Sequence, residues 1–161
     1  MRLSILIIAA VSSASPASAA HTLFARGDWA AFDFGERCDA RSRMLQPPAQ
    51  VKPPPFAGFL FDPGGPALGQ FYVRLSRPTK TGSAVMLSVG NLPFLLTSQE
   101  QAAWSRSPAQ SQAIIAAVRG GGTMRVQFRD TGGRRYSDYY GLTGAATAID
   151  AAAAACAGKV R

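Results

Sequence analysis

Side chains in the middle of the chain alternate between apolar and polar, and this period of two limits the fold more than any other feature. In residues 69–77 (GQFYVRLSR), the apolar side chains of Phe71, Val73 and Leu75 are separated by polar or amphipathic ones. Such alternation predicts a strand with one buried and one solvated face, which is typical of antiparallel sheets. We therefore expect the domain to be built on antiparallel strands.

A hairpin is predicted after this strand. Ala84 to Val89 alternates in the same way, and an apolar run over residues 92–96 follows the dipeptide Gly90-Asn91. A Gly-Asn pair between apolar runs favours a two-residue hairpin turn, because Gly readily adopts a positive φ. Pro93 has no amide hydrogen, so we expect the second arm to lie at a sheet edge or beside a bulge.

Three more segments are expected to be strands. Residues 27–34 (GDWAAFDF) indicate an opening strand with clustered aromatic side chains. Residues 124–129 alternate again, and residues 135–142 indicate the returning strand after a turn at Asp130 to Gly133. These last two strands form a second predicted hairpin.

Two helices are also expected. Ser107, Pro108 and Gln110 match a capping box with Pro at the first helical position, and Gly120 ends this helix. We expect Thr143 to cap a second helix that continues to the end of the domain. Its apolar stripe, at helical spacing, consists of Leu142, Ala145, Ile149, Ala152 and Cys156.

Together these patterns predict one α+β domain over residues 20–161, mainly an antiparallel β-sheet, open barrel or sandwich, packed by two helices. Residues 46–55 (QPPAQVKPPP) contain five prolines. Proline fixes φ and lacks an amide hydrogen, so this segment predicts an exposed extended loop. The loop is either a spacer or a docking peptide for a proline-binding partner.

Residues 1–19 have the pattern of a cleaved secretory signal peptide. Met1-Arg2 supplies a positive charge, residues 3–11 (LSILIIAAV) are apolar, and Ala17-Ser18-Ala19 fits an A-x-A cleavage site. The apolar run is too short to span a bilayer. We therefore expect a protein of the periplasm or the medium, without a transmembrane segment. The alternative is that the run is a buried N-terminal strand.

The two cysteines lie near opposite ends of the predicted domain. Cys38 and Cys156 have each other as their sole intramolecular partner, and export would place them where disulfides persist. One disulfide between them is expected, with two buried free thiols as the alternative. The absence of a Cys-x-x-Cys spacing disfavours a thioredoxin-like redox role.

The sequence offers few groups for catalysis or metal binding. One His and two Cys cannot easily form a zinc site or a Ser-His-Asp triad. His21 would lie in an exposed tail beside the mature N-terminus. The glycine clusters match no phosphate-binding motif. We expect no catalytic residues, no metal and no cofactor.

Paired carboxylates are the remaining route to catalysis, since glycoside hydrolysis needs two of them. The candidates are Asp62, Glu100, Asp130, Asp138 and Asp150. Asp138 is unusual because it shares a strand face with Tyr136 and Tyr140, although an Asp in this position is more often paired with a neighbouring Arg. A carboxylate-dependent enzyme that cleaves envelope glycans is therefore the alternative to a non-enzymatic protein.

Basic residues gather on the second predicted hairpin. The chain has 17 Lys and Arg against 9 Asp and Glu, a formal net charge of +8. Antiparallel pairing would bring Arg125 and Arg129 near Arg135, with Tyr139 as an aromatic neighbour. Export removes nucleic acid as a ligand, so an envelope polyanion, either anionic lipid or acidic glycan, is the expected partner. The alternative is a solvated basic face that aids solubility.

Several short motifs resemble the invasion-associated locus B family, in particular its small alphaproteobacterial exported branch. They are Gly27-Asp28-Trp29, Cys38 with Ala40 and Ser42, the helix from Ile114 to Gly120, Met124 to Val126, Tyr140 to Gly144, and the terminal Cys156. The resemblance covers most of residues 24–157. It implies an envelope or secreted β-rich protein without established catalytic residues. We expect an exported, monomeric binding or adaptor protein, whose partner is an envelope polyanion or another envelope protein.

Overall fold

The computed structural model describes residues 20–65 and 67–159. Within these residues the chain forms ten strands and two helices. The strands are β1 (His21–Arg26), β2 (Trp29–Asp33), β3 (Cys38–Arg43), β4 (Phe56–Phe61), β5 (Leu68–Arg74), β6 (Val85–Val89), β7 (Leu92–Gln99), β8 (Ala102–Trp104), β9 (Thr123–Arg129) and β10 (Arg135–Gly141). The helices are α1 (Pro108–Arg119) and α2 (Ala145–Ala157). The predicted signal peptide, residues 1–19, lies outside the described residues.

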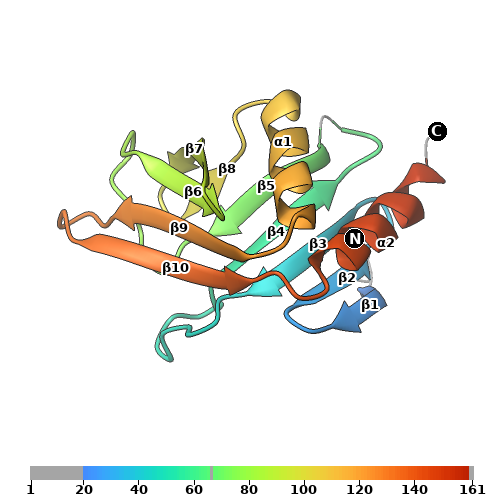
Figure 1. Cartoon of the computed structure of the whole chain (residues 1–161), viewed down its shortest axis with the longest axis horizontal. Helices are drawn as coiled ribbons and strands as arrows, with labels where there is room; N and C mark the ends of the chain where they lie inside the picture. The colour runs from blue at the N-terminus through green and yellow to red at the C-terminus, as the bar shows by residue number, and fades with distance from the viewer. Residues whose placement is uncertain (1–19, 66, 160–161) are drawn as a thin grey trace, which may run out of the picture.

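The strands form one open antiparallel sheet in the order β1-β2-β3-β4-β5-β8-β7-β6-β9-β10 (Figure 1). The predicted α+β class, an antiparallel sheet packed by two helices, is confirmed. Beyond β3, the Leu45 N–H donates to the carbonyl oxygen of Tyr139 on β10, over 2.8 Å. The chain after β3 therefore contacts the far end of the sheet, although the sheet does not close.

The core lies on the face of the sheet that carries the helices. Helix α1 packs mainly on β5, and α2 packs on β2 and β3. Trp29 stacks on Phe59, which in turn meets the edge of Phe71. The Trp29 indole N–H is satisfied by the carbonyl oxygen of Gly141, at 2.9 Å. All five residues of the predicted stripe on the last helix are buried.

The predicted β6–β7 hairpin is confirmed, with Gly90 at φ +55° in its turn. Pro93 pairs with Ser88 of β6. On its other side, β7 pairs with β8, and within the described residues this pairing covers only residues 97–99 of β7. At Pro93 that side of β7 is therefore a free edge of the sheet. The missing proline N–H thus removes no ladder hydrogen bond.

Helix α1 begins as the sequence predicts. The Ser107 hydroxyl accepts a hydrogen bond from the Gln110 N–H at 3.1 Å, and Pro108 occupies the first turn. The Gln110 side chain accepts from the N–H of Arg106 at 2.7 Å, one residue before the cap, and donates to the Leu95 carbonyl oxygen. The cap therefore also attaches the helix to β7.

Three expectations about local structure need correction. Residues 27–34 contain a strand, β2, but it is not the opening one: β1 precedes it, and Gly27, at φ +64°, makes the turn between them. His21 is exposed as expected, but it begins β1 rather than lying in a tail. Thr143 does not cap α2: Gly144, at φ +88°, is the cap residue, and no side chain bonds there. The Thr143 carbonyl oxygen instead accepts from the Asp28 N–H.

The turn between β1 and β2 contacts the start of α2 where Gly144 has no side chain. A Cβ at Gly144 would lie 2.3 Å from the Arg26 carbonyl oxygen, and its φ is in the left-handed region. We expect Gly144→Ala to lower the free energy of unfolding by about 3 kcal/mol, from backbone strain plus overpacking. Gly82→Ala is the matched control, because Gly82 has φ +78° but open space around it. In urea unfolding, the free energy of unfolding of this control should fall by about 1 kcal/mol. Equal decreases for Gly144→Ala and Gly82→Ala would contradict the close contact at Gly144.

Candidate functional site

The hairpin of β9 and β10 brings the predicted basic residues together. Arg135 pairs directly with Arg129, and Tyr139 pairs directly with Arg125. Residues that pair directly across two strands project from the same face of the sheet. This face, defined by Arg125, Arg129, Arg135 and Tyr139, is called the basic face below. Met124, Val126 and Phe128 alternate with these arginines and are buried on the opposite side, so the hydrophobic pattern fixes the register.

The arginines of the basic face are not neutralised by nearby carboxylates. Within residues 20–65 and 67–159, none of Arg125, Arg129 and Arg135 forms an ion pair. Arg129 donates through Nη1 to the Gly133 carbonyl oxygen, at 2.8 Å, which holds its side chain over the turn. The Asp130 carboxylate in this turn accepts from the Arg134 N–H. A hollow of about 660 Å³ is lined by Arg129 and Arg135.

The basic face includes an exposed aromatic side chain and adjoins an exposed apolar one. Tyr139 is 46% exposed, and Leu45, 53% exposed, follows β3 and bonds through its N–H to the Tyr139 carbonyl oxygen. An amphipathic tyrosine beside arginines provides both a stacking surface and guanidinium donors. The face can therefore contact a ligand that combines negative charge with apolar or ring surfaces.

The carboxylate that the sequence singled out, Asp138, has a structural role. It is 1% exposed. Its Oδ2 accepts from the Ser76 N–H at 2.8 Å, and its Oδ1 accepts from the Ser76 hydroxyl at 2.5 Å. The partner is thus a serine beyond β5, rather than the expected arginine. Asp138 links the segment after β5 to β10 and has no access to a substrate.

The other candidate carboxylates are held in surface turns or ion pairs. Asp62 accepts from the Gly64 N–H, and Asp150 forms an ion pair with Arg119 between the two helices. Glu100 lies exposed in the turn between β7 and β8, with φ +51°. Among the described residues, no group of three or more His, Cys, Asp or Glu side chains could hold a metal ion.

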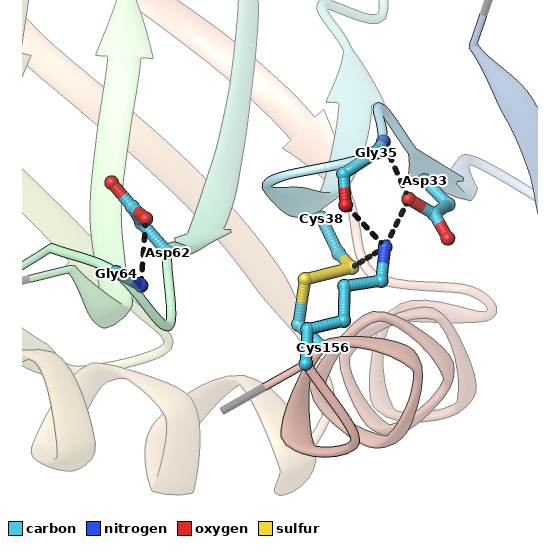
Figure 2. Close-up of a disulfide and its surroundings, with 7 residues drawn as sticks. Asp33, Gly35, Cys38, Asp62, Gly64 and Cys156 are labelled. Carbon is cyan, nitrogen blue, oxygen red and sulfur yellow. Dashed lines mark hydrogen bonds and ion pairs between the residues drawn. A yellow bond between two sulfur atoms is a disulfide. The ribbon is translucent and has the colours of Figure 1, made fainter. Parts of the chain in front are cut away.

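The disulfide joins the two ends of the domain (Figure 2). Cys38 at the start of β3 is bonded to Cys156 near the end of α2, 118 positions later, with 5.8 Å between their Cα atoms. This confirms the predicted pairing. Lys159 pairs with Asp33 and donates to the Gly35 carbonyl oxygen at 2.8 Å. Its hydrogen bond lowers the pKa of Asp33. A covalent and an ionic contact therefore attach the end of α2 to β2 and β3.

Sequence reasoning missed a polar cluster on the face of the sheet opposite to α2. Asp39 on β3 is 1% exposed, and its Oδ2 accepts from Arg41 Nε at 2.8 Å and from the Tyr72 hydroxyl at 3.0 Å. Asp39 Oδ1 is buried without a hydrogen-bond partner among the described residues. The alternation of Asp39, Arg41 and Arg43 in β3 was the signal, since such a strand has one charged face.

Two buried carboxyl groups have perturbed pKa values. Burial raises the pKa of Asp138 and outweighs the two Ser76 hydrogen bonds, which favour the charged form. Burial likewise raises the pKa of Asp39 despite the adjacent Arg41. Burial raises the pKa of the Tyr140 hydroxyl, and the nearby Asp138 carboxylate raises it further.

A carboxyl whose pKa is raised by folding stabilises the fold below its ordinary pKa and loses that contribution as the pH rises through the raised value. Asp138→Asn removes this titration, and its amide can accept from the Ser76 N–H and donate to Ser76 Oγ. We therefore expect the free energy of unfolding of Asp138→Asn, measured relative to that of the wild type, to be higher at pH 7 than at pH 4. Urea unfolding at both pH values measures this. Asp33 and Asp150, whose pKa values are lowered, titrate alike in both proteins and so cancel in the comparison. If the two proteins differed in free energy of unfolding by the same amount at pH 4 and pH 7, the expectation would be contradicted.

Comparison with family models, with curated proteins and with solved structures finds no match for this chain. No helix in the described residues is long and apolar enough to cross a membrane. The class of protein is therefore defined by the fold and the site alone: an open antiparallel sheet, cross-linked by one disulfide, with a basic face that forms no ion pair within the described part of the chain.

Proposed function

We propose that this chain is an exported envelope protein that binds polyanions through the basic face and catalyses no reaction. The observation that carries the proposal is the register of β9 and β10, which pairs Arg129 with Arg135 and Arg125 with Tyr139. Like charges directly opposite each other on a sheet destabilise it. A polyanionic ligand would relieve this repulsion, because guanidinium groups bind phosphate and carboxylate oxygens in fork-like pairs.

Two features support the proposed compartment. The Cys38–Cys156 disulfide is a bond that persists in oxidising compartments, and residues 1–19 have the pattern of an export signal. The resemblance to the invasion-associated locus B family, through motifs within residues 24–157, also favours the periplasm or the medium. The ligands available there are anionic lipid headgroups and acidic glycans.

The alternative, a glycan-cleaving enzyme, needs two carboxyl groups that reach the substrate. Asp138 is buried against Ser76, and Asp150 is paired with Arg119. These contacts favour the binding protein over the enzyme.

Sedimentation with vesicles tests the proposal. We expect the protein to be retained on vesicles that contain phosphatidylglycerol and not on pure phosphatidylcholine vesicles. Retention should fall steeply between low and physiological salt, because the Debye length shrinks to about 8 Å at 0.15 M. A resin carrying oligogalacturonate tests the acidic-glycan source under the same conditions. Equal retention on neutral vesicles, or retention on neither anionic probe, would refute polyanion binding.

A further inference from the structure

A second concave surface is lined by residues of β2, β3 and β4, which are several strands away from β9 and β10 in the sheet order. It is a groove of about 700 Å³ between the turn that joins β1 to β2 and the prolines that precede β4. Ala30, Phe32 and Arg41 line it from β2 and β3, and Phe56 lines it from β4. Its volume falls in the range of sites for small organic ligands, about 300–1,000 Å³.

Hydrogen bonds and close packing hold both walls of the groove. The turn at Gly27 is fixed by the Asp28 N–H, which bonds the Thr143 carbonyl oxygen at 3.0 Å. On the opposite wall, Arg74 donates to the Pro53 carbonyl oxygen, and the Met44 N–H donates to that of Pro55, both at 3.3 Å. Preformed walls reduce the entropy lost on binding.

The guanidinium of Arg41 is already oriented in the groove. Its Nε and Nη2 donate to Asp39 Oδ2 at 2.8 and 2.5 Å, and its central carbon lies 5.1 Å from the ring centre of Phe56 and 5.2 Å from that of Phe34. Nη1 has no hydrogen-bond partner among the described residues. Both N–H groups of Nη1 are therefore free to donate from a rigid, partly desolvated position.

The charge of the groove suits a ligand with one negative charge. Arg26 and Arg43 are exposed, line the groove beside Arg41 and form no ion pair within the described residues. Asp28 also lines the groove, and Asp39 lies beneath Arg41. Three cations against two carboxylates leave an excess of one positive charge.

We propose that this groove binds a monoanionic amphiphile, a carboxylate attached to a hydrocarbon body. The carboxylate would accept from Arg41 Nη1 and from Arg43, whose side chain lies at the rim. The hydrocarbon would lie against Phe32, Phe56 and the prolines of the opposite wall, where its apolar surface leaves water. The groove shares no residue with the basic face, so this inference does not rest on polyanion binding. The two surfaces are nevertheless neighbours, because Arg43 lies two positions before Leu45, whose N–H bonds to the Tyr139 carbonyl oxygen.

Calorimetric titration with dodecanoate below its micelle concentration tests the assignment. We expect saturable binding of dodecanoate, at least tenfold weaker binding of acetate, and at least tenfold weaker binding of the neutral amphiphile dodecanol. Arg43→Gln should weaken dodecanoate binding about tenfold, the loss expected for one charged hydrogen bond. Arg135→Gln, an equal change on the basic face, should leave it unchanged.

The reciprocal experiment separates the two sites. Arg43→Gln should be retained on phosphatidylglycerol vesicles as strongly as the wild type, whatever the outcome for dodecanoate. Equal binding of dodecanol and dodecanoate, or dodecanoate binding that Arg43→Gln leaves unchanged and Arg135→Gln weakens, would overturn the proposed site. Absence of dodecanoate binding by the folded wild-type protein would overturn it as well.

Discussion

Loss of the Cys38–Cys156 disulfide is expected to lower the free energy of unfolding by about 5 kcal/mol in the chain-entropy description. The bond closes a loop of 118 positions, nearly the whole described domain. Most of the loss comes from the unfolded chain, which gains conformational freedom when the bond is absent. For a domain of this size, such a loss corresponds to a fall in melting temperature on the order of 15 °C.

Urea unfolding of the wild type with and without reductant, beside Cys38→Ala/Cys156→Ala, measures this effect. The reduced wild type and the double variant should unfold at the same urea concentration, well below that of the oxidised protein. Lys159→Met is the matched control for the neighbouring ionic contact, and it should shift the midpoint far less, because partly exposed ion pairs contribute at most about 1 kcal/mol. A reduced protein as stable as the oxidised one would show that the bond does not constrain the unfolded chain.

The sequence predicts those parts of the fold that local patterns decide. The β6–β7 hairpin follows from Gly90-Asn91 between alternating runs, and the start of α1 follows from Ser107 and Gln110, because each depends on neighbours a few positions apart. The basic face could be predicted for the same reason. A hairpin around Asp130 to Gly133 has a register that its own turn and its own apolar alternation determine.

Contacts between distant segments could not be predicted in this way. Strand β3 has few large apolar side chains, and its Asp39 is buried because Tyr72, 33 positions later, covers it and donates to it. The cap of α2 is Gly144 rather than Thr143, and the Arg26 carbonyl oxygen, from a distant segment, occupies the space that a Cβ would take at position 144. The groove likewise combines the turn at Gly27 with β3 and the prolines before β4, which no local pattern connects.

Reversal of two charges on the basic face has the largest expected effect on binding. Arg125→Glu with Arg129→Glu changes the charge of this face by four units. Each basic residue near an anionic membrane contributes about 1 kcal/mol, so retention on anionic vesicles should fall by about 100-fold or more. The fold should survive, because position 129 lies directly opposite Arg135. A glutamate there replaces a repulsive cross-strand pair with an attractive one.

A control with the same change in net charge distinguishes the basic face from overall electrostatics. Lys52→Glu/Arg106→Glu serves, since both side chains are exposed and lie outside β9 and β10. Long-range attraction would weaken both double variants equally, whereas a local site would weaken one of them. Melting temperatures within a few degrees of the wild type would show that both variants remain folded.

The most direct test is therefore the retention of these three proteins on phosphatidylglycerol vesicles at low salt. We expect the wild type and Lys52→Glu/Arg106→Glu to sediment with the vesicles, and Arg125→Glu/Arg129→Glu to remain in the supernatant. Equal sedimentation of the two double variants would contradict a binding site on β9 and β10 and would leave the basic surface a role in solubility alone.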